Sequence, residues 1–501
     1  MHLKKIAALV AVACAGLSGQ ASAALSDSAA NTAVISSAVT GGRVFFISGA
    51  SATQKGLAGI ATTLFSSSFR LANTSASSRD FEAVAGTMQV GPWSGQTAII
   101  IDRVKGGSVF GVNSVARDTN GDGISPNEGE AIESLSVNTT DCTTGSGTVA
   151  DPYICLTTNG GTRPHRIPDA GISDVAPDKF VSPVNTEGET AAPTLSEQEL
   201  ADLTVQPIYT LAFGVPVTNN VNPKLTRATV AGVMTGNITN WNEVDPAEPS
   251  ADIIICRRVQ GSGSQAVDNL YFGNYPCSAN LVNEPANRES TTAWNNAANT
   301  YTINAASGFQ VIENSTSGDV RNCLTNAAAA TTTDKSYATK DRDGAPVTVT
   351  FKAKAGGHKA IGVLSMDSIA SSNAATAPLG WSFRSLGGKG TVSCTGTCPA
   401  TTAPVEAGTG IFPNEANLAD GTWDLQGWVS WNVPARTVAD ATKLGVADAF
   451  RDAAQDPAVL NGVPDTNWVA LALPAPYSSY SGAGVQKVQY VLGNQCGPLY
   501  R

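Results

Sequence analysis

Histidine is nearly absent from this 501-residue chain. The sequence holds three histidines: His2 stands at the N-terminus, and only His165 and His358 lie farther along. Zinc hydrolases and serine nucleophiles depend on histidine as a ligand or as a base. The composition therefore argues against both kinds of site, and each remaining histidine is more simply a loop residue than a catalyst.

Charge is also scarce. Charged residues make up 14% of the chain, the formal net charge is −10, and no basic cluster is present. Nucleic-acid binding depends on a concentrated positive field, so we expect no nucleic acid as a partner. A small anion remains compatible with this balance, because its binding depends on local donors rather than on net charge.

The chain lacks a hydrophobic run long enough to span a bilayer. The apolar segment Ile6–Leu17 is too short, but it follows the basic Met1–Lys5 and precedes residues 21–23, which fit an A-x-A cleavage site. This pattern predicts an export signal over residues 1–23 and a periplasmic, secreted or cell-surface protein without a membrane span. Cys14 allows a lipoprotein alternative, which Ala11, three places before it, disfavours.

Cysteines in the remaining chain predict disulfides. Of nine cysteines, Cys14 leaves with the signal, and an even count of eight in an exported chain is typical of a disulfide framework. Eight cysteines allow about 105 arrangements, so proximity along the chain is only a guide. It suggests the pairs Cys142–Cys155, Cys256–Cys277 and Cys394–Cys398, with Cys323–Cys496 left over.

The most informative stretch combines a buried strand, a tight turn and a helix. Residues 253–255 are three isoleucines, residues 261–264 read Gly-Ser-Gly-Ser, and Gln265 begins a helical pattern. Such a turn directs backbone N–H groups and the positive helix end to one spot, and Arg257 and Arg258 lie just upstream. The stretch predicts an anion cradle; the alternative is a surface turn with two solvated arginines.

Two other turns share this chemistry. Strand residues 44–47 lead into the small-residue turn 49–52, after which the hydroxyl of Thr53 could cap a helix. A strand over residues 97–104 leads into a glycine turn that carries Ser108. Either turn could bring a ligand close to the backbone, or could be an ordinary strand-to-helix connection.

An acidic loop begins at Asp118. Oxygen side chains alternate there and a glycine follows, which is typical of short calcium loops in secreted proteins, although Gly129 stands where an EF-hand carries its bidentate glutamate. The alternative is a solvated turn rich in Asp and Asn. A bound calcium ion would be structural, and no other cofactor is expected. The expected ligands are Asp118, Asn120, Asp122, Ile124 through its carbonyl, and Glu128, with Glu130 as the alternative to Glu128.

Five segments, in order along the chain, resemble the periplasmic phosphate-binding proteins of ABC importers, in the type II periplasmic-binding-protein superfamily. The segments are ISGASAT at 47–53, DAGISDVAPDKF at 169–180, LTRATVAGVMTGNITNWNEV at 225–244, RRVQGSGS at 257–264 and KAIGVLS at 359–365. The resemblance implies a two-lobed α/β clamshell whose hinge the chain crosses twice, with the ligand held between the lobes. It places lobe 1 at 40–208, with an insertion at about 112–165, lobe 2 at 209–414, and a return to lobe 1 at 415–501.

The resemblance also implies a set of ligand-binding residues. One acceptor carboxylate in that set would select an oxyanion that still carries a proton, which phosphate does and sulfate does not. Two positions depart from the family, since Gln260 replaces an acidic residue and Gln54 an aromatic one. The implied residues are Thr53, the amide of Gln54, Ser108, Arg258, Ser262, Gly263 and Ser264 as donors, and Asp174 as acceptor.

Three functions fit these observations. The first is an exported, non-enzymatic binding protein for phosphate or a related oxyanion, with an ABC permease as a partner. The second is a cell-surface or matrix scaffold that keeps the fold without a transport role. The third is a secreted phosphate-ester hydrolase, which the scarcity of histidine disfavours.

Overall fold

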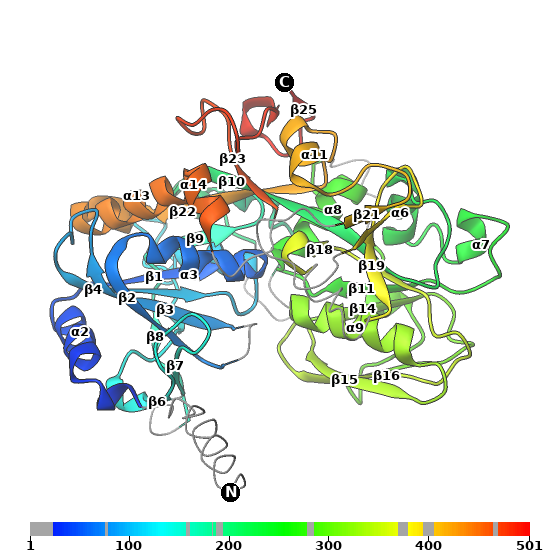
Figure 1. Ribbon diagram of the computed structural model, residues 1–501, viewed down its shortest axis with the longest axis horizontal. Coiled ribbons are helices and arrows are strands. Elements are labelled where there is room, and N and C mark those ends of the chain that lie inside the picture. The colour runs from blue at the N-terminus through cyan, green and yellow to red at the C-terminus, as the bar shows by residue number, and fades with distance from the viewer. Residues whose placement is uncertain are drawn as a thin grey trace, which may run out of the picture.

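Two α/β lobes lie side by side in the computed structural model, joined by two long strands (Figure 1). The structure describes residues 24–75, 79–156, 161–182, 184–186, 194–277, 285–368, 379–393, 405–463 and 469–501. The predicted export signal and the predicted pair Cys394–Cys398 lie outside these residues. Among the described helices, none has the length and apolar character needed to cross a membrane.

Lobe 1 is built on a twisted sheet. Strands β1 (Val44–Gly49) and β4 (Thr97–Arg103) are parallel neighbours, with Val44 opposite Ile99, and β3 (Phe81–Met88) and β2 (Phe65–Ala72) continue the sheet in antiparallel order. Successive side chains of a strand point to opposite faces. One face therefore packs on α2 (Ala29–Thr40), and the other on α3 (Gln54–Thr62) and α13 (Ala441–Gln455).

The predicted insertion extends this sheet. Strand β7 (Tyr153–Cys155) adds to β2 in parallel, and β6 (Cys142–Thr144) pairs with β7 as a hairpin. A disulfide between Cys142 and Cys155 closes that hairpin, as the sequence suggested.

Lobe 2 is built around the stretch with the three isoleucines. The run forms β11 (Ile254–Arg258), which lies between β14 (Gln310–Asn314) and β17 (Ala360–Gly362), parallel to both. Helix α8 (Gly263–Gly273) follows β11, so the predicted strand, turn and helix are confirmed, with the helix starting two residues before Gln265. Helix α9 (Ser317–Ala329) covers the sheet.

Two strands carry the chain between the lobes. Strand β10 (Leu203–Thr218) pairs with β22 (Gln426–Pro434) from Leu203 opposite Pro434 to Ala212 opposite Gln426. The second half of β10 then pairs with β19 (Trp381–Arg384) in lobe 2. Because β22 also pairs with β9 (Ala170–Ser173) of lobe 1, both sheets are tied to the same pair of strands.

Two of the suggested disulfides are wrong. Cys256 of β11 is bonded to Cys323 of α9, and Cys277, after α8, is bonded to Cys496 in the C-terminal segment. The bonded cysteines are 67 and 219 positions apart in the sequence, and the fold brings them together. Cys256 and Cys277 do not pair, because they lie at the two ends of the β11–α8 unit.

The remaining elements are short. The helices are α4 (Asn113–Ala116), α5 (Glu197–Ala201), α6 (Arg227–Met234), α7 (Trp241–Val244), α11 (Glu415–Asp420), α12 (Ala435–Ala439) and α14 (Pro457–Gly462). The strands are β5 (Ile132–Glu133), β8 (His165–Arg166), β12 (Trp294–Asn295), β13 (Thr300–Ile303), β15 (Lys335–Lys340), β16 (Pro346–Phe351), β18 (Leu364–Ser365), β20 (Thr391–Ser393), β21 (Val405–Ala407), β23 (Ala470–Ala472), β24 (Gln489–Tyr490) and β25 (Leu499–Tyr500).

Candidate functional site

The N-terminus of α8 meets lobe 1 at close range. Gly261 adopts a left-handed φ of 77°, Ser262 is the extended N-cap, and its side chain makes no capping hydrogen bond. A Cβ added to Gly263 would lie 2.1 Å from Ser108 Oγ and 2.3 Å from Asp174 Oδ2. Glycine is therefore required at position 263 for the helix end to approach lobe 1 this closely.

Ser108 and Asp174 form the lobe 1 side of this contact. Ser108 starts the turn after β4 and Asp174 directly follows β9, so both lie at the carboxyl ends of strands of the same sheet. The Ser108 hydroxyl donates to Asp174 Oδ2 at 3.1 Å, and the Asp174 backbone N–H donates to Ser108 Oγ at 3.2 Å. Both side chains are buried.

Three buried polar atoms in this cluster have no hydrogen-bond partner among the residues that the structure describes. They are Asp174 Oδ1, Ser262 Oγ and Ser264 Oγ, and all three residues are at most 1% exposed. A buried polar group without a partner costs about 1–3 kcal/mol, so several in one place call for an explanation. Two hydroxyls, one carboxylate oxygen and a helix N-terminus together form a ready set of partners for a small oxyanion.

Burial controls the protonation of Asp174. It raises the pKa of Asp174 to about 7, against the opposing effects of the Ser108 hydrogen bond and the Arg258 charge. Near neutral pH this carboxyl group can therefore either accept or donate a proton.

Arg258 links the two lobes. Its Nη1 donates to Ser51 Oγ of lobe 1 at 2.8 Å and to Ser317 Oγ of α9 at 3.1 Å, and its Nη2 donates to the Ser315 carbonyl at 2.7 Å. Burial lowers the pKa of Arg258 to about 10, partly offset by the charges of Asp319 and Asp174, so it remains a cation at neutral pH.

Arg257 points away from this site. Side chains alternate along a strand, so the two adjacent arginines of β11 face opposite ways. Arg257 forms a buried ion pair with Glu313 at 2.7 Å and donates to the Ala286 carbonyl at 2.6 Å. The cradle suggested by the sequence therefore has one arginine.

Thr53 and Gln54 are engaged within lobe 1. The Thr53 hydroxyl donates to the Ala50 carbonyl at 2.8 Å, and the Gln54 backbone N–H donates to the Ser51 carbonyl. The Gln54 side-chain amide donates to the Arg79 carbonyl. The residue of this turn that contacts Arg258 is Ser51, which sequence reasoning missed although its hydroxyl lies in the same small-residue turn.

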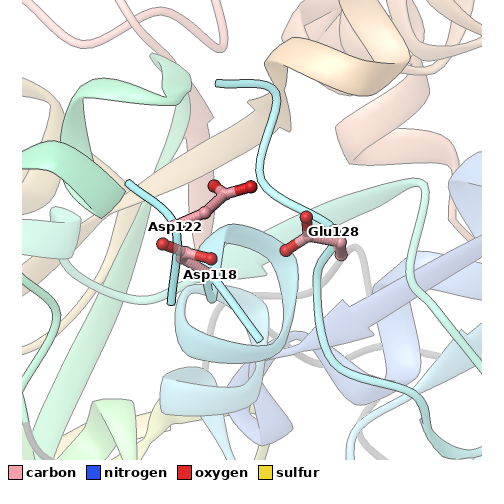
Figure 2. Close-up of side chains that lie close together, drawn as sticks. All are labelled: Asp118, Asp122 and Glu128. Atoms are coloured by element: carbon pink, nitrogen blue, oxygen red, sulfur yellow. The ribbon is translucent and has the colours of Figure 1, made fainter. Parts of the chain in front are cut away.

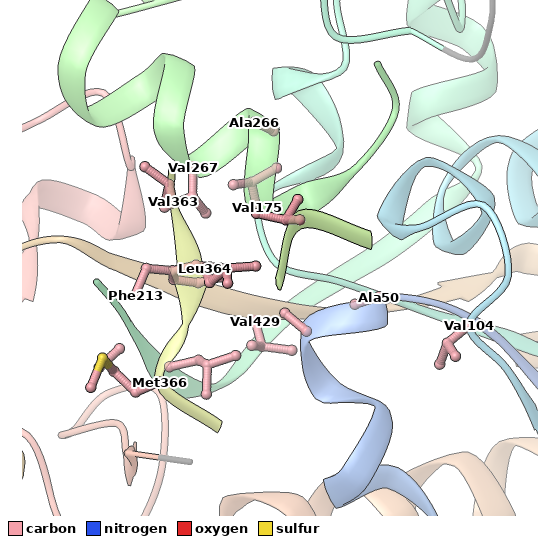
Figure 3. Close-up of a cluster of buried hydrophobic side chains, with 14 of the residues drawn as sticks. Ala50, Val104, Val175, Phe213, Ala266, Val267, Val363, Leu364, Met366 and Val429 are labelled. Carbon is pink, nitrogen blue, oxygen red and sulfur yellow. The ribbon is translucent and has the colours of Figure 1, made fainter. Parts of the chain in front are cut away.

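An apolar shell surrounds the cluster. Ala266 and Val267 on α8, Val175 after β9 and Phe213 on β10 belong to one cluster of buried hydrophobic side chains (Figure 3). Val175 directly follows Asp174, and Ala266 and Val267 follow Ser264 on α8. Water is thus kept away, which strengthens the electrostatic interactions inside the site.

The acidic loop forms a separate cluster at the surface. One carboxylate oxygen from each of Asp118, Asp122 and Glu128 lies within 4.8 Å of the others (Figure 2). Asn120 Nδ2 donates to Asp122 Oδ2 at 3.1 Å, while the Ile124 side chain is 66% exposed. The Gly123 N–H, 2.7 Å from Asp118, and other backbone donors of the loop hold the pKa of Asp118 below its ordinary value.

A family comparison identifies lobe 2. Residues 208–425 match the profile described as PBP superfamily domain, a span that runs from within β10 to the residue before β22. The structure confirms the predicted α/β class, and the family match confirms the predicted periplasmic-binding-protein fold over these residues. No curated protein sequence is significantly similar to the chain.

Solved structures give weaker similarities. One is described as a phosphate ABC transporter substrate-binding protein with bound phosphate from Clostridium perfringens, at 12% identity and a TM-score of 0.37, over 82% of this chain and 93% of that chain. An ABC-type phosphate transport receptor from Vibrio cholerae matches at 13% identity and a TM-score of 0.30, over 59% of this chain and 79% of that chain. A phosphate-binding protein from Stenotrophomonas maltophilia matches at 12% identity and a TM-score of 0.31, over 78% of this chain and 78% of that chain. Scores this low carry no argument about the ligand.

Proposed function

We propose that this chain, whose residues 208–425 carry a PBP superfamily domain, is an exported binding protein that captures phosphate between its two lobes. The observation that carries the proposal is the set of three unpartnered, buried polar atoms at the N-terminus of α8. A bound oxyanion would accept hydrogen bonds from Ser262, Ser264 and the helix N–H groups, and would share a proton with Asp174. Arg258 would supply the opposite charge.

No catalytic step belongs to this proposal. The site brings together donors and one acceptor. The disulfides in both lobes fit an oxidising compartment outside the cytoplasm. Delivery of the ligand to an ABC permease is part of the same proposal.

Calorimetric titration of phosphate-stripped protein with phosphate, arsenate and sulfate tests this function. We expect phosphate and arsenate to bind and sulfate to be excluded at pH 8, and we expect Arg258→Ala to abolish binding. Arg227→Ala serves as the control, because this half-exposed arginine pairs with Asp424 on the surface of lobe 2. A folded protein that binds none of the oxyanions would contradict the proposal and favour the scaffold function.

We further propose that the loop from Asp118 to Glu128 holds a structural calcium ion, since its three carboxylates converge. Hard oxygen ligands and a glycine-containing turn suit this ion. Calcium should raise the melting temperature of chelator-treated protein, magnesium should do so less, and Asp122→Asn should remove the effect. An equal response to both ions, or none, would leave the loop as a solvated turn.

A further inference from the structure

A second space lies between the lobes beside Arg258. It is a cavity of about 520 Å³. Lobe 1 contributes Ser51, Gln54 and Phe110, and lobe 2 contributes Arg258 and the hairpin turn 341–344 between β15 and β16. None of Ser108, Asp174, Ser262 or Ser264 lines it, so it adjoins the oxyanion cluster rather than coinciding with it.

The cavity is too large for the oxyanion alone. One water fills about 30 Å³ of liquid, so a phosphate ion with its four oxygens needs on the order of 100 Å³. The space also persists although the lobes already touch. Val109 N donates to the Gly261 carbonyl at 3.0 Å, and Arg258 donates to Ser51. Cavities of this size normally hold a small organic molecule.

Its walls suit a hydroxyl-rich group. Asp80, Asp341 and Lys340 line the cavity together with the hydroxyl residues Thr316 and Thr339. Carboxylates and hydroxyls bind polyols and sugars by accepting and donating hydrogen bonds in alternation. An apolar surface, suited to the C–H face of such a group, is formed by Val104, Val109, Val259 and Phe110.

The outer wall is held in place by buried ion pairs. Arg342 of the hairpin turn contacts Glu313 on β14 through its Nε at 3.0 Å and through Nη2. Asp341 Oδ1 accepts from the backbone N–H groups of Asp343 at 3.0 Å and Ala345 at 2.8 Å. These contacts fix the turn against the lobe 2 sheet, so the cavity is largely preformed.

Arg258 and Ser51 both line the cavity, and so does Val109, the chain neighbour of Ser108 in the cluster. The Arg258 charge lowers the pKa of Asp174 in the cluster. A phosphoryl group that replaced the Ser51 hydroxyl on Arg258 would therefore have one oxygen facing the cavity. Gln260, which stands where the family carries an acidic residue, also lines this space and adds no negative charge to it.

We infer that the ligand is a phosphate monoester of a small polyol or sugar, with its phosphoryl group in the oxyanion cluster and its organic group in the cavity. This inference rests on the proposed phosphate function. A monoester loses its last proton near pH about 6, so above that pH the shared proton must come from Asp174. The raised pKa of Asp174, about 7, makes this possible near neutrality.

The test compares inorganic phosphate, glycerol phosphate, a hexose phosphate and the unphosphorylated hexose by calorimetry at pH 7. We expect at least one ester to bind about tenfold or more tightly than inorganic phosphate, and the free sugar not to bind. Ala338→Trp should fill the cavity from an exposed strand position and weaken the ester about tenfold, with phosphate unchanged. Ser336→Trp, on the same strand but outside the cavity lining, is the matched control.

The possible outcomes distinguish a failure of this inference from a failure of the proposed phosphate-binding function. Tight phosphate binding with weaker esters, or ester binding that Ala338→Trp leaves unchanged, would overturn the inference and preserve the phosphate function. Failure of phosphate and of every ester to bind would overturn both. Loss of binding with both tryptophan variants would also overturn it, because the effect would not belong to the cavity.

Discussion

At the scale of single residues, Asp174 couples the site to pH. Its pKa is raised from 3.8 to about 7 by burial, so the folded protein holds a proton that the unfolded chain releases. Between these values Asp174 holds more protons in the folded state, so its contribution to the free energy of unfolding of the ligand-free protein falls as pH rises and levels off above pH 7. The full effect is on the order of 4 kcal/mol.

Asp174→Asn should flatten that decline, as measured by denaturant unfolding at pH values between 4 and 8. Asp268 on α8 has its pKa raised to about 7 for the same reason, burial, and contributes with the same sign. Asp268→Asn therefore serves as the comparison, because it should flatten the decline without changing oxyanion binding. An unchanged slope in Asp174→Asn would show that this carboxyl group is ionised in the folded protein.

The same carboxyl group should make ligand choice depend on pH. Above pH 7 Asp174 is mostly ionised, accepts a proton from phosphate and repels sulfate. Below pH 6 it is mostly protonated and can donate to either ion. We expect the ratio of phosphate to sulfate affinity to fall about tenfold or more between pH 8 and pH 5.5, and to be nearly constant in Asp174→Asn. A wild-type ratio that does not change with pH would contradict this role.

At the scale of elements, the start of α8 leaves no room for added volume at Gly263. The Cβ of Gly263→Ala would meet Ser108 Oγ at 2.1 Å and Asp174 Oδ2 at 2.3 Å, so the helix must retreat from lobe 1. We expect about 1–3 kcal/mol lower stability and at least about tenfold weaker phosphate binding. Gly462→Ala is the control, since no atom of the described residues lies within 4 Å of its Cβ. Unchanged phosphate affinity in Gly263→Ala would place the ligand elsewhere.

Local signals in the sequence were enough to predict β11, its turn and α8. Three isoleucines and a Gly-Ser-Gly-Ser turn predict that unit without reference to distant residues. The partners of Arg258 could not be predicted in the same way. Ser51 and Ser317 reach it from another lobe and from another helix, so their roles depend on lobe contact. Residues 280–346 carried no motif, yet they supply β14 and α9 to the lobe 2 core.

At the scale of the whole molecule, the disulfide between Cys277 and Cys496 connects the two lobes. Cys277 follows α8 in lobe 2. Beside Cys496, the Gln495 side chain bonds the Ala176 N–H of lobe 1 at 2.9 Å and the Trp428 carbonyl of β22 at 3.0 Å. Proximity along the chain could not reveal this pair. It depends on the position of the C-terminal segment after the chain has passed between the lobes through β10 and β22.

The Cys277–Cys496 disulfide should contribute more stability than the Cys142–Cys155 disulfide of the hairpin. In the loop-entropy account, closing 219 residues contributes about 5 kcal/mol and closing 13 residues about 3 kcal/mol. Cys277→Ser with Cys496→Ser should therefore lower the denaturation midpoint more than Cys142→Ser with Cys155→Ser. It should also raise hydrogen exchange in residues 489–501, and it should widen the ligand-free protein in small-angle scattering, because the segment that ties lobe 2 to β22 is released. The contrary result would be a larger loss of stability from Cys142→Ser with Cys155→Ser, together with unchanged scattering from Cys277→Ser with Cys496→Ser. It would mean that the two crossing strands, β10 and β22, alone set the spacing of the lobes.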